Sequence, residues 1–171
     1  MFLNYRKKEK QKVFVASYGM SLLEFVIATA LVGFVAISLV QVGELSLRYS
    51  RFADNRTTAT FLLQEGVEAV TMLRDESWDQ HIASRTTDVD YFLNFSGPAY
   101  TLSETPSPFI DNKFERTIRF ADVLRDAQFD IAASGNTDTE TKKITVTVSW
   151  FNKTATTTEQ IEFYLTNLFK N

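Results

Sequence analysis

A long uncharged apolar segment near the start of the chain limits most strongly how this protein can fold. Residues 25–40 read FVIATALVGFVAISLV and contain no charged residue, and the apolar character continues to about Gly43. Counted from Met20, the segment has about 24 residues, enough for a helix to cross a hydrocarbon core of about 30 Å with some tilt. We therefore expect one transmembrane helix at residues 20–43 and a domain that folds outside the membrane.

Basic residues before the apolar segment predict its orientation. They are Arg6, Lys7, Lys8, Lys10 and Lys12. Positively charged flanks stay on the cytoplasmic side of a membrane, so the C-terminal part would be exported. A secretory signal peptide would have a shorter apolar region, with its cleavage site after that region. The sequence thus favours a single-pass protein of the cytoplasmic (inner) membrane, whose C-terminal domain lies outside the cytoplasm.

One carboxylate lies inside the start of the apolar segment. Glu24 ends the stretch Gly-Met-Ser-Leu-Leu-Glu, residues 19–24. Ionisable groups are costly in hydrocarbon, so such a residue is a functional hypothesis by default. The basic leader, Gly19, the Glu five residues later and the apolar run together resemble the class III signal of the type IV prepilin family.

This resemblance implies a processing site and an assembly role. Prepilin peptidase would cleave between Gly19 and Met20, which removes the basic leader and leaves the apolar helix on the mature chain. Met20 would then be N-methylated, and Glu24 would neutralise the Met20 amine of the same or a neighbouring helix. The alternative for Glu24 is an interfacial residue whose side chain reaches water. The partners implied are prepilin peptidase, other pilin or pseudopilin subunits, and the membrane with its pilus assembly platform.

The rest of the sequence predicts an α+β fold. Proline is absent between residues 1 and 97, so one continuous helix is expected from Met20 to about Glu76. Its first half is apolar on all sides, whereas residues 44–76 carry an amphipathic stripe that a sheet can cover. This layout resembles the type IV pilin architecture. The expected divisions are a basic leader (1–19), a transmembrane or filament-core half of the helix (20–43), an amphipathic half (44–76) and an antiparallel β-rich domain (77–171).

Alternating apolar and polar residues after Trp78 predict the strands of that domain. Residues 143–150 alternate most clearly, and residues 129–132 are expected to pair with them. Residues 79–89 and 153–158 are polar and are interpreted as a loop and a turn. The expected strands are residues 91–95, 99–103, 114–123, 129–132, 143–150 and 159–165.

Charge and composition exclude several function classes. The net charge is −3, and loss of the leader, with five basic residues and one acidic residue, would lower it to −7. No nucleic-acid binding is expected from so acidic a chain. The one basic cluster, Arg116, Arg119 and Arg125, is interpreted as a solvated strand face. Cysteine is absent, so the disulfide-closed loop of many major pilins is missing. Gln41 also replaces their helix-bending proline.

No residue pattern indicates an enzyme, a cofactor or a metal site. His81 has Ser77 and Asp79 nearby, but sequence neighbours rarely form a hydrolytic triad, and a solvated loop histidine is favoured. Acidic residues flank the turn at residues 134–136, and such turns can hold calcium. Their spacing does not match an EF-hand, so a plain turn is favoured. These acidic residues are Asp130, Asp138 and Glu140.

Three functions remain open at this point. The first is a minor pilin or pseudopilin, a structural subunit of a type IV pilus or type II secretion-like filament that ends in an extracellular filament. The second is a permanently membrane-anchored extracytoplasmic binding or cell-adhesion module. The third is an exported enzyme on a stalk, for which the polar residues offer no catalytic group. The sequence does not separate pilus, secretion and competence filaments.

Overall fold

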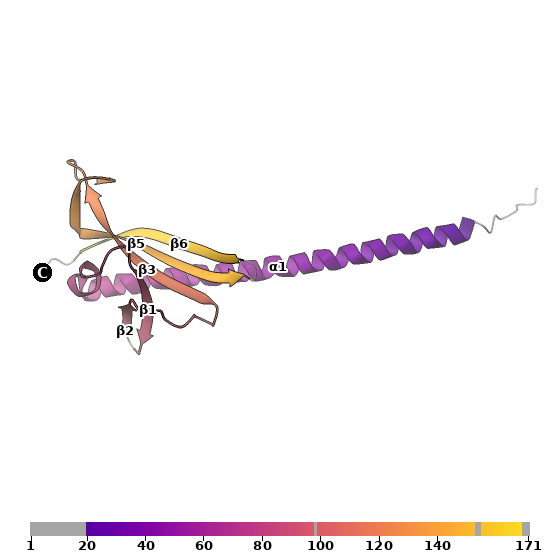
Figure 1. The fold of residues 1–171 in the computed structure, drawn as a ribbon, viewed down its shortest axis with the longest axis horizontal. Helices are drawn as coiled ribbons and strands as arrows, with labels where there is room; N and C mark the ends of the chain where they lie inside the picture. Colours follow the sequence, from indigo (N-terminus) through magenta and orange to yellow (C-terminus); the bar gives the residue numbers. More distant parts are fainter. Residues whose placement is uncertain (1–19, 98, 153–154, 169–171) are drawn as a thin grey trace, which may run out of the picture. The chain divides into compact units, whose positions relative to one another are not determined.

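The computed structural model describes residues 20–97, 99–152 and 155–168. The leader, including Gly19, lies outside the described residues. The chain divides into two compact units, the first ending at Ser50 and the second running from Arg51 to Asn171. Helix α1 (Met20–Glu76) has 57 residues and contributes to both units. This confirms the helix expected from the absence of proline (Figure 1).

Six strands follow α1 and form one antiparallel sheet in the second unit (Figure 1). The main strand order is β2-β1-β3-β5-β6, and β4 pairs with β3 outside this path. The strands β3, β5 and β6 are long, and β6 is the outermost strand on its side of the sheet. The strands are β1 (Asp90–Ser96), β2 (Ala99–Ser103), β3 (Phe114–Arg125), β4 (Ile131–Ala132), β5 (Asn136–Asn152) and β6 (Ala155–Thr166).

The long α1 helix and the antiparallel sheet give the α+β layout expected from the sequence, but three local expectations are wrong. Ile131–Ala132 pairs with the end of β3 and not with residues 143–150. Strand β6 begins at Ala155, inside the segment interpreted as a turn, because its threonines are β-branched residues that suit an exposed strand. Asp79–Ala83 forms a π-helical turn instead of a loop, and its Ile82 is fully buried.

One face of the sheet packs against the C-terminal part of α1. Buried residues recur along the helix at three- and four-residue spacing, and every second residue of β5 faces them. The apolar stripe is covered only from Ala59 onward, whereas Leu45 and Tyr49 are exposed. The residues of this interface include Ala59, Leu63, Val70 and Leu73 from α1 and Ile118, Phe120, Ile144, Val146 and Val148 from the sheet.

Gly66 lets the helix approach the sheet closely. A Cβ atom built on Gly66 would lie 2.7 Å from Val146 Cγ1 and 3.4 Å from Arg116 Cδ. Side chains do not tolerate the first of these distances, so a larger residue would push α1 away from β5. The closeness of this contact fixes where the helix lies on the sheet.

A buried arginine ties the helix to the sheet beside this contact. Arg116 is only 8% exposed, and its Nη1 donates to the carbonyl of Leu62 at 3.0 Å and to Glu65 Oε2 at 2.9 Å. The interpretation of a solvated strand face is therefore wrong for Arg116. Arg119 points to the opposite face of β3, where it pairs with Asp90 at 2.7 Å, because residues an odd number apart face opposite sides of a strand.

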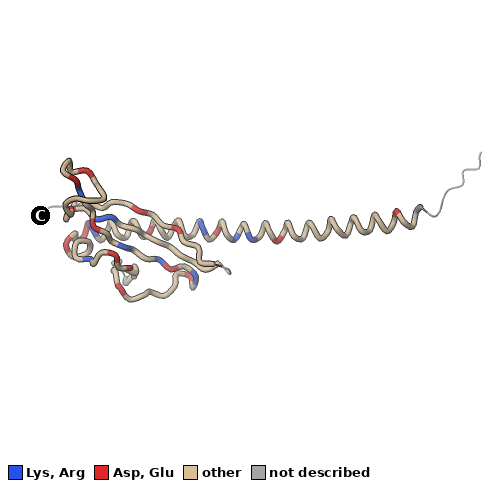
Figure 2. The backbone as a smooth tube through the Cα atoms, turned by 45° about the horizontal axis from the view of Figure 1, so that its top comes forward, with Lys and Arg blue, Asp and Glu red and all other residues tan. Residues whose placement is uncertain are grey.

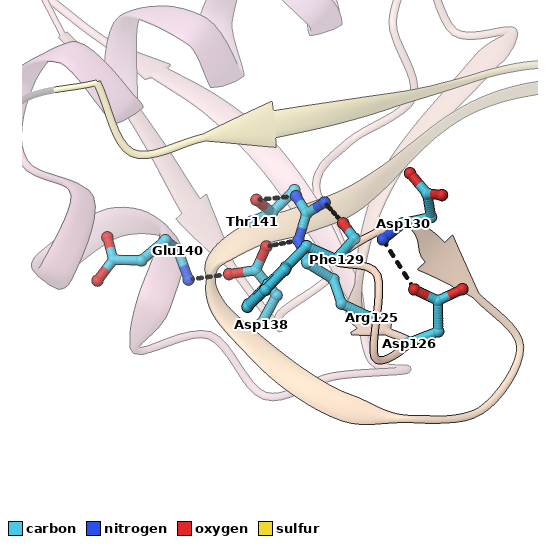
Figure 3. A network of polar contacts seen from close by, with 7 residues as sticks. All are labelled: Arg125, Asp126, Phe129, Asp130, Asp138, Glu140 and Thr141. Atoms are coloured by element: carbon cyan, nitrogen blue, oxygen red, sulfur yellow. Dashed lines mark hydrogen bonds and ion pairs between the residues drawn. The ribbon is translucent and has the colours of Figure 1, made fainter.

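Arg125, at the end of β3, organises the turn that leads to β4 and β5 (Figure 3). Its Nε donates to Asp138 Oδ2 at 2.6 Å, and its Nη1 donates to the carbonyl of Phe129 at 2.8 Å. Asp126 Oδ1 accepts from the backbone N–H of Gln128 and of Asp130, each at 2.9 Å. The Arg125 guanidinium and the Asp126 carboxylate thus hold both sides of the turn.

Replacing Asp138 by Asn should remove an acid-sensitive contact from this turn. Burial alone would raise the pKa of Asp138, but hydrogen bonds from Arg125, Thr141 and the Glu140 backbone outweigh burial and hold its pKa below the ordinary value of 3.8. Because the pKa of Asp138 is lower in the folded protein than in the unfolded chain, its ionised carboxylate stabilises the fold. This stabilisation is full above about pH 4 and is lost as the pH falls through the pKa that Asp138 has in the folded protein. At neutral pH we expect Asp138→Asn to lose about 1–3 kcal/mol of unfolding free energy.

The measurement is the urea midpoint of the parent and of Asp138→Asn at several pH values from neutral to acid. The difference between the two proteins should shrink as the pH falls below about 4. A difference that stays constant across this range would contradict the assignment.

Candidate functional site

The apolar half of α1 has no cover within its own unit. Helix residues Leu22–Glu76 include a window with mean hydropathy 2.4, none of which is buried in the structure, and by length and composition this helix can cross a membrane. Its large side chains are well exposed, from 51% at Ile27 to 73% at Leu22. A core helix of a soluble protein would bury such a surface. The segment therefore needs lipid or other helices around it.

The hydroxyl groups of Thr29 and Ser38, inside the apolar half, are satisfied by the helix itself. Thr29 Oγ1 donates to the carbonyls of Phe25 at 2.7 Å and Val26 at 3.0 Å. Ser38 Oγ donates to the carbonyl of Phe34 at 2.9 Å. In hydrocarbon an unpaired polar group has no water to bind, so these internal bonds suit a lipid or helix-packed environment.

Glu24 is the one charged residue of α1 before Glu44 (Figure 2). Helix α1 begins at Met20, and Glu24 comes four residues later, about one helical turn along. The Glu24 side chain is exposed, and no group in the described part of the chain pairs with its carboxylate. Charged residues resume with the exposed Glu44–Arg48 pair, 3.8 Å apart.

The glycines of the apolar half leave open surface. A Cβ atom at Gly33 or at Gly43 would meet nothing within 4 Å. Small residues allow other helices to approach closely in membranes. The helix is continuous through Gln41.

The structure places the other candidate residues from the sequence in local contacts. His81 Nε2 lies 3.5 Å from Glu76 Oε2, and its side chain is only 24% exposed in the π-helical turn. The expectation of a solvated loop histidine is therefore wrong. The Ser77 hydroxyl oxygen accepts from the backbone N–H of Gln80 instead. Asp138 is held by Arg125, and no group of three metal-ligating side chains is found among residues 20–97, 99–152 and 155–168.

Sequence reasoning missed a polar cavity on the face of the sheet that α1 does not cover. The cavity has a volume of about 480 Å³. Two ion pairs cross it, Arg119–Asp90 at 2.7 Å and Lys143–Glu162 at 3.0 Å. The hydrogen bond with Glu162 raises the pKa of Lys143. The polar residues that alternate with apolar ones along β3, β5 and β6 were the sequence signal for this cavity.

No protein-family model, no curated protein and no solved structure matches this chain with significant similarity. What the chain does must therefore be inferred from its own residues and structure.

Proposed function

We propose that this chain is a minor pilin or pseudopilin, a structural subunit of a type IV pilus or type II secretion-like filament that prepilin peptidase processes. The observation that carries the proposal is Glu24, a lone carboxylate at the start of an uncovered apolar helix. A basic leader ending in Gly19 comes directly before that helix.

The chemistry of the first helical turn supports an assembly role. Cleavage after Gly19 would give Met20 a positively charged amine, and N-methylation would keep that charge. Glu24 lies one turn further along and has no partner within the described residues. In a bundle of apolar helices, a carboxylate and an amine of the same or adjacent subunits would neutralise one another, whereas either charge alone would be costly.

The remaining architecture is compatible with this role. The apolar half of α1 would lie in the inner membrane before assembly and among other subunits' helices in the filament. The part of α1 from Ala59 onward covers one face of the sheet, and the β-rich domain would lie outside the cytoplasm. The competing function is a permanently anchored binding or adhesion module, which would keep its leader.

The processing step gives the direct test. Gly19→Trp should block cleavage, since glycine allows another backbone or an active site to approach closely and a bulky residue prevents this. The measurement is the intact mass of the protein extracted from membranes. The parent should lack residues 1–19, and Gly19→Trp should retain them.

Gln11→Trp provides the control, because it places the same bulk in the leader away from the site. We expect this variant to be cleaved like the parent. Cleavage of Gly19→Trp at the parental position would contradict the proposal. Retention of the leader by the parent would favour the anchored module.

A further inference from the structure

Two carboxylates bound the uncharged part of α1. Glu24 and Glu44 lie on the same unbroken helix, and no charged residue stands between them (Figure 2). Glu44 comes twenty residues after Glu24, which at about 1.5 Å per residue is about 30 Å along the helix. The hydrocarbon core of a bilayer is also about 30 Å thick. An upright helix would therefore place one carboxylate at each boundary of the hydrocarbon.

The direction of helical side chains makes the two boundaries different. Side chains of an α-helix tilt toward its N-terminus. Glu24, at the N-terminal boundary, would therefore point out of the hydrocarbon toward water. Glu44, at the other boundary, would point back toward the hydrocarbon, where a lone carboxylate is costly. Glu44 thus needs a cation beside it, whereas Glu24 needs none while the helix spans a bilayer.

Arg48 supplies that cation one turn further along. Its Nη2 lies 3.8 Å from Glu44 Oε2, and the two side chains are 78% and 67% exposed. An acid four residues before a base is the favourable order for such a pair. The distance is too long for a hydrogen bond, and no other group in the described part of the chain accepts from Arg48. The guanidinium therefore keeps its donors for a further partner.

Arg48 also stands at the height of the lipid phosphates. It comes four residues after Glu44, which is about 6 Å along the axis. A bilayer measures about 40–45 Å with its headgroups, so each headgroup layer is about 5–7.5 Å thick. Phosphate oxygens accept charge-assisted hydrogen bonds from a guanidinium, often two at once. The exposed Tyr49 lies at the same height, where tyrosine is enriched in membrane proteins.

The charges of this stretch favour an anionic partner. Between Glu24 and Asp54 the charged residues are Glu44, Arg48 and Arg51, so the stretch carries a net positive charge. Arg51 comes seven residues after Glu44, about 10.5 Å along the helix. Arg48 is thus the arginine that can both neutralise Glu44 and reach a phosphate.

We propose that α1 crosses the bilayer with Glu24 at the cytoplasmic boundary of the hydrocarbon and Glu44 at the outer boundary, and that Arg48 binds a lipid phosphate beside Glu44. The inference rests on the membrane anchor of the proposed function, and it names the lipid group that holds this anchor at its outer end. The Glu24 carboxylate would then stay in contact with water until the helix leaves the membrane for the filament.

The depth of a fluorophore in vesicles tests the two boundaries, because the chain contains no cysteine. Leu31→Cys, Phe34→Cys and Ile37→Cys variants of the full chain, each at an exposed position, are labelled with a nitrobenzoxadiazole maleimide. They are reconstituted in phosphatidylcholine vesicles with lipids that carry a quenching nitroxide at different depths. We expect the label at Phe34, midway between the carboxylates, to be deepest, and those at Leu31 and Ile37 to be equally deep. A helix centred on residues 20–43 would place Leu31 about 7.5 Å deeper than Ile37.

The charged pair is then changed in the same labelled variants. Arg48→Ala leaves Glu44 without its cation, so the helix should move outward by about 3 Å (two residues) or more, and the Leu31 label should become deeper than the Ile37 label. Adding Glu44→Gln should restore equal depths. Arg51→Ala is the matched control, because it removes the same side chain further from the boundary, and it should leave the depths unchanged.

Solid-state NMR tests the contact with phosphate directly. Isotope-labelled arginine Cζ carbons in the same vesicles should be dephased by lipid phosphorus. We expect this dephasing to fall in Arg48→Ala and to stay at the parental level in Arg51→Ala.

Three results would overturn the inference: a Leu31 label deeper than the Ile37 label in the parent, depths unchanged by Arg48→Ala, or dephasing unchanged by Arg48→Ala. The vesicles contain no peptidase and no other subunit. Normal leader cleavage and filament incorporation in cells alongside any of these results would therefore leave the proposed function intact. Absence of quenching at all three labelled positions would contradict the membrane anchor itself, and with it the proposed function.

Discussion

A Glu24→Leu variant should insert into the membrane and lose its leader normally, yet be incorporated into filaments far less than the parent. Removing a charge from the apolar run makes insertion easier, so failed insertion cannot explain the loss. The Met20 amine would instead be left unpaired at the contact between helices. An uncompensated buried charge costs about 3–5 kcal/mol, which is a factor of several hundred or more in the assembly equilibrium.

The measurement is the amount of the subunit in sheared filaments relative to the membrane fraction. Gln41→Leu is the matched control, because it removes a polar side chain from the same apolar helix and should leave incorporation unchanged. Glu24→Asp should be intermediate, since it keeps the charge but shortens its reach. Equal incorporation of Glu24→Leu and the parent would rule out the pairing mechanism and favour the anchored module.

Gly66→Leu should lower the unfolding free energy of the β-rich domain by at least about 3 kcal/mol. Overpacking a core ordinarily costs about 1–3 kcal/mol, so this loss lies at or above the upper end of that range. Its first side-chain carbon would already lie 2.7 Å from Val146 Cγ1. The helix would have to move off β5, which would also disturb the bond from Arg116 to the Leu62 carbonyl. The unfolding free energy of a native protein is typically about 5–15 kcal/mol, so such a loss would remove a large part of it.

The same substitution at Gly43 provides the control, because a Cβ there meets nothing within 4 Å. Both tryptophans, Trp78 and Trp150, lie in the core of the domain. Tryptophan fluorescence during urea unfolding of the full chain in detergent therefore reports this domain alone. Matching midpoints for Gly66→Leu and Gly43→Leu would show that the helix does not depend on the close contact.

The long helix and the main strands could be predicted from patterns of neighbouring residues in the sequence. No proline interrupts residues 20–76, and the alternation from Ile144 to Trp150 matches β5 where it crosses the core. The burial of Arg116 was also readable, because it shares its side of β3 with Ile118 and Phe120. Arg116 was nevertheless interpreted as exposed, because charged side chains are mostly found at the surface. Its partners on α1, the Leu62 carbonyl and Glu65, are more than fifty positions away in the sequence.

The other features depended on tertiary structure. The strand β4 is only two residues long and pairs with the end of β3, and so short a strand leaves no alternation to detect. A polar run such as residues 155–160 becomes a strand because β5 lies beside it. For the candidate site, Glu24 and the apolar run could be located from the sequence, because both follow from residue type. The polar cavity on the sheet could not, because side chains from β1, β3, β5 and β6 meet there only after folding.

Strand β6 also affects how copies of this protein behave when they are crowded together. It pairs with β5 on one side, and no strand among the described residues pairs with its other side. A long unpaired edge is a template for aggregation, which charged side chains on the edge oppose. Glu159 is held by Arg56 at 2.9 Å and Glu162 by Lys143 at 3.0 Å. These carboxylates place charge in the middle of the strand, where it opposes edge-to-edge pairing with the sheet of another copy.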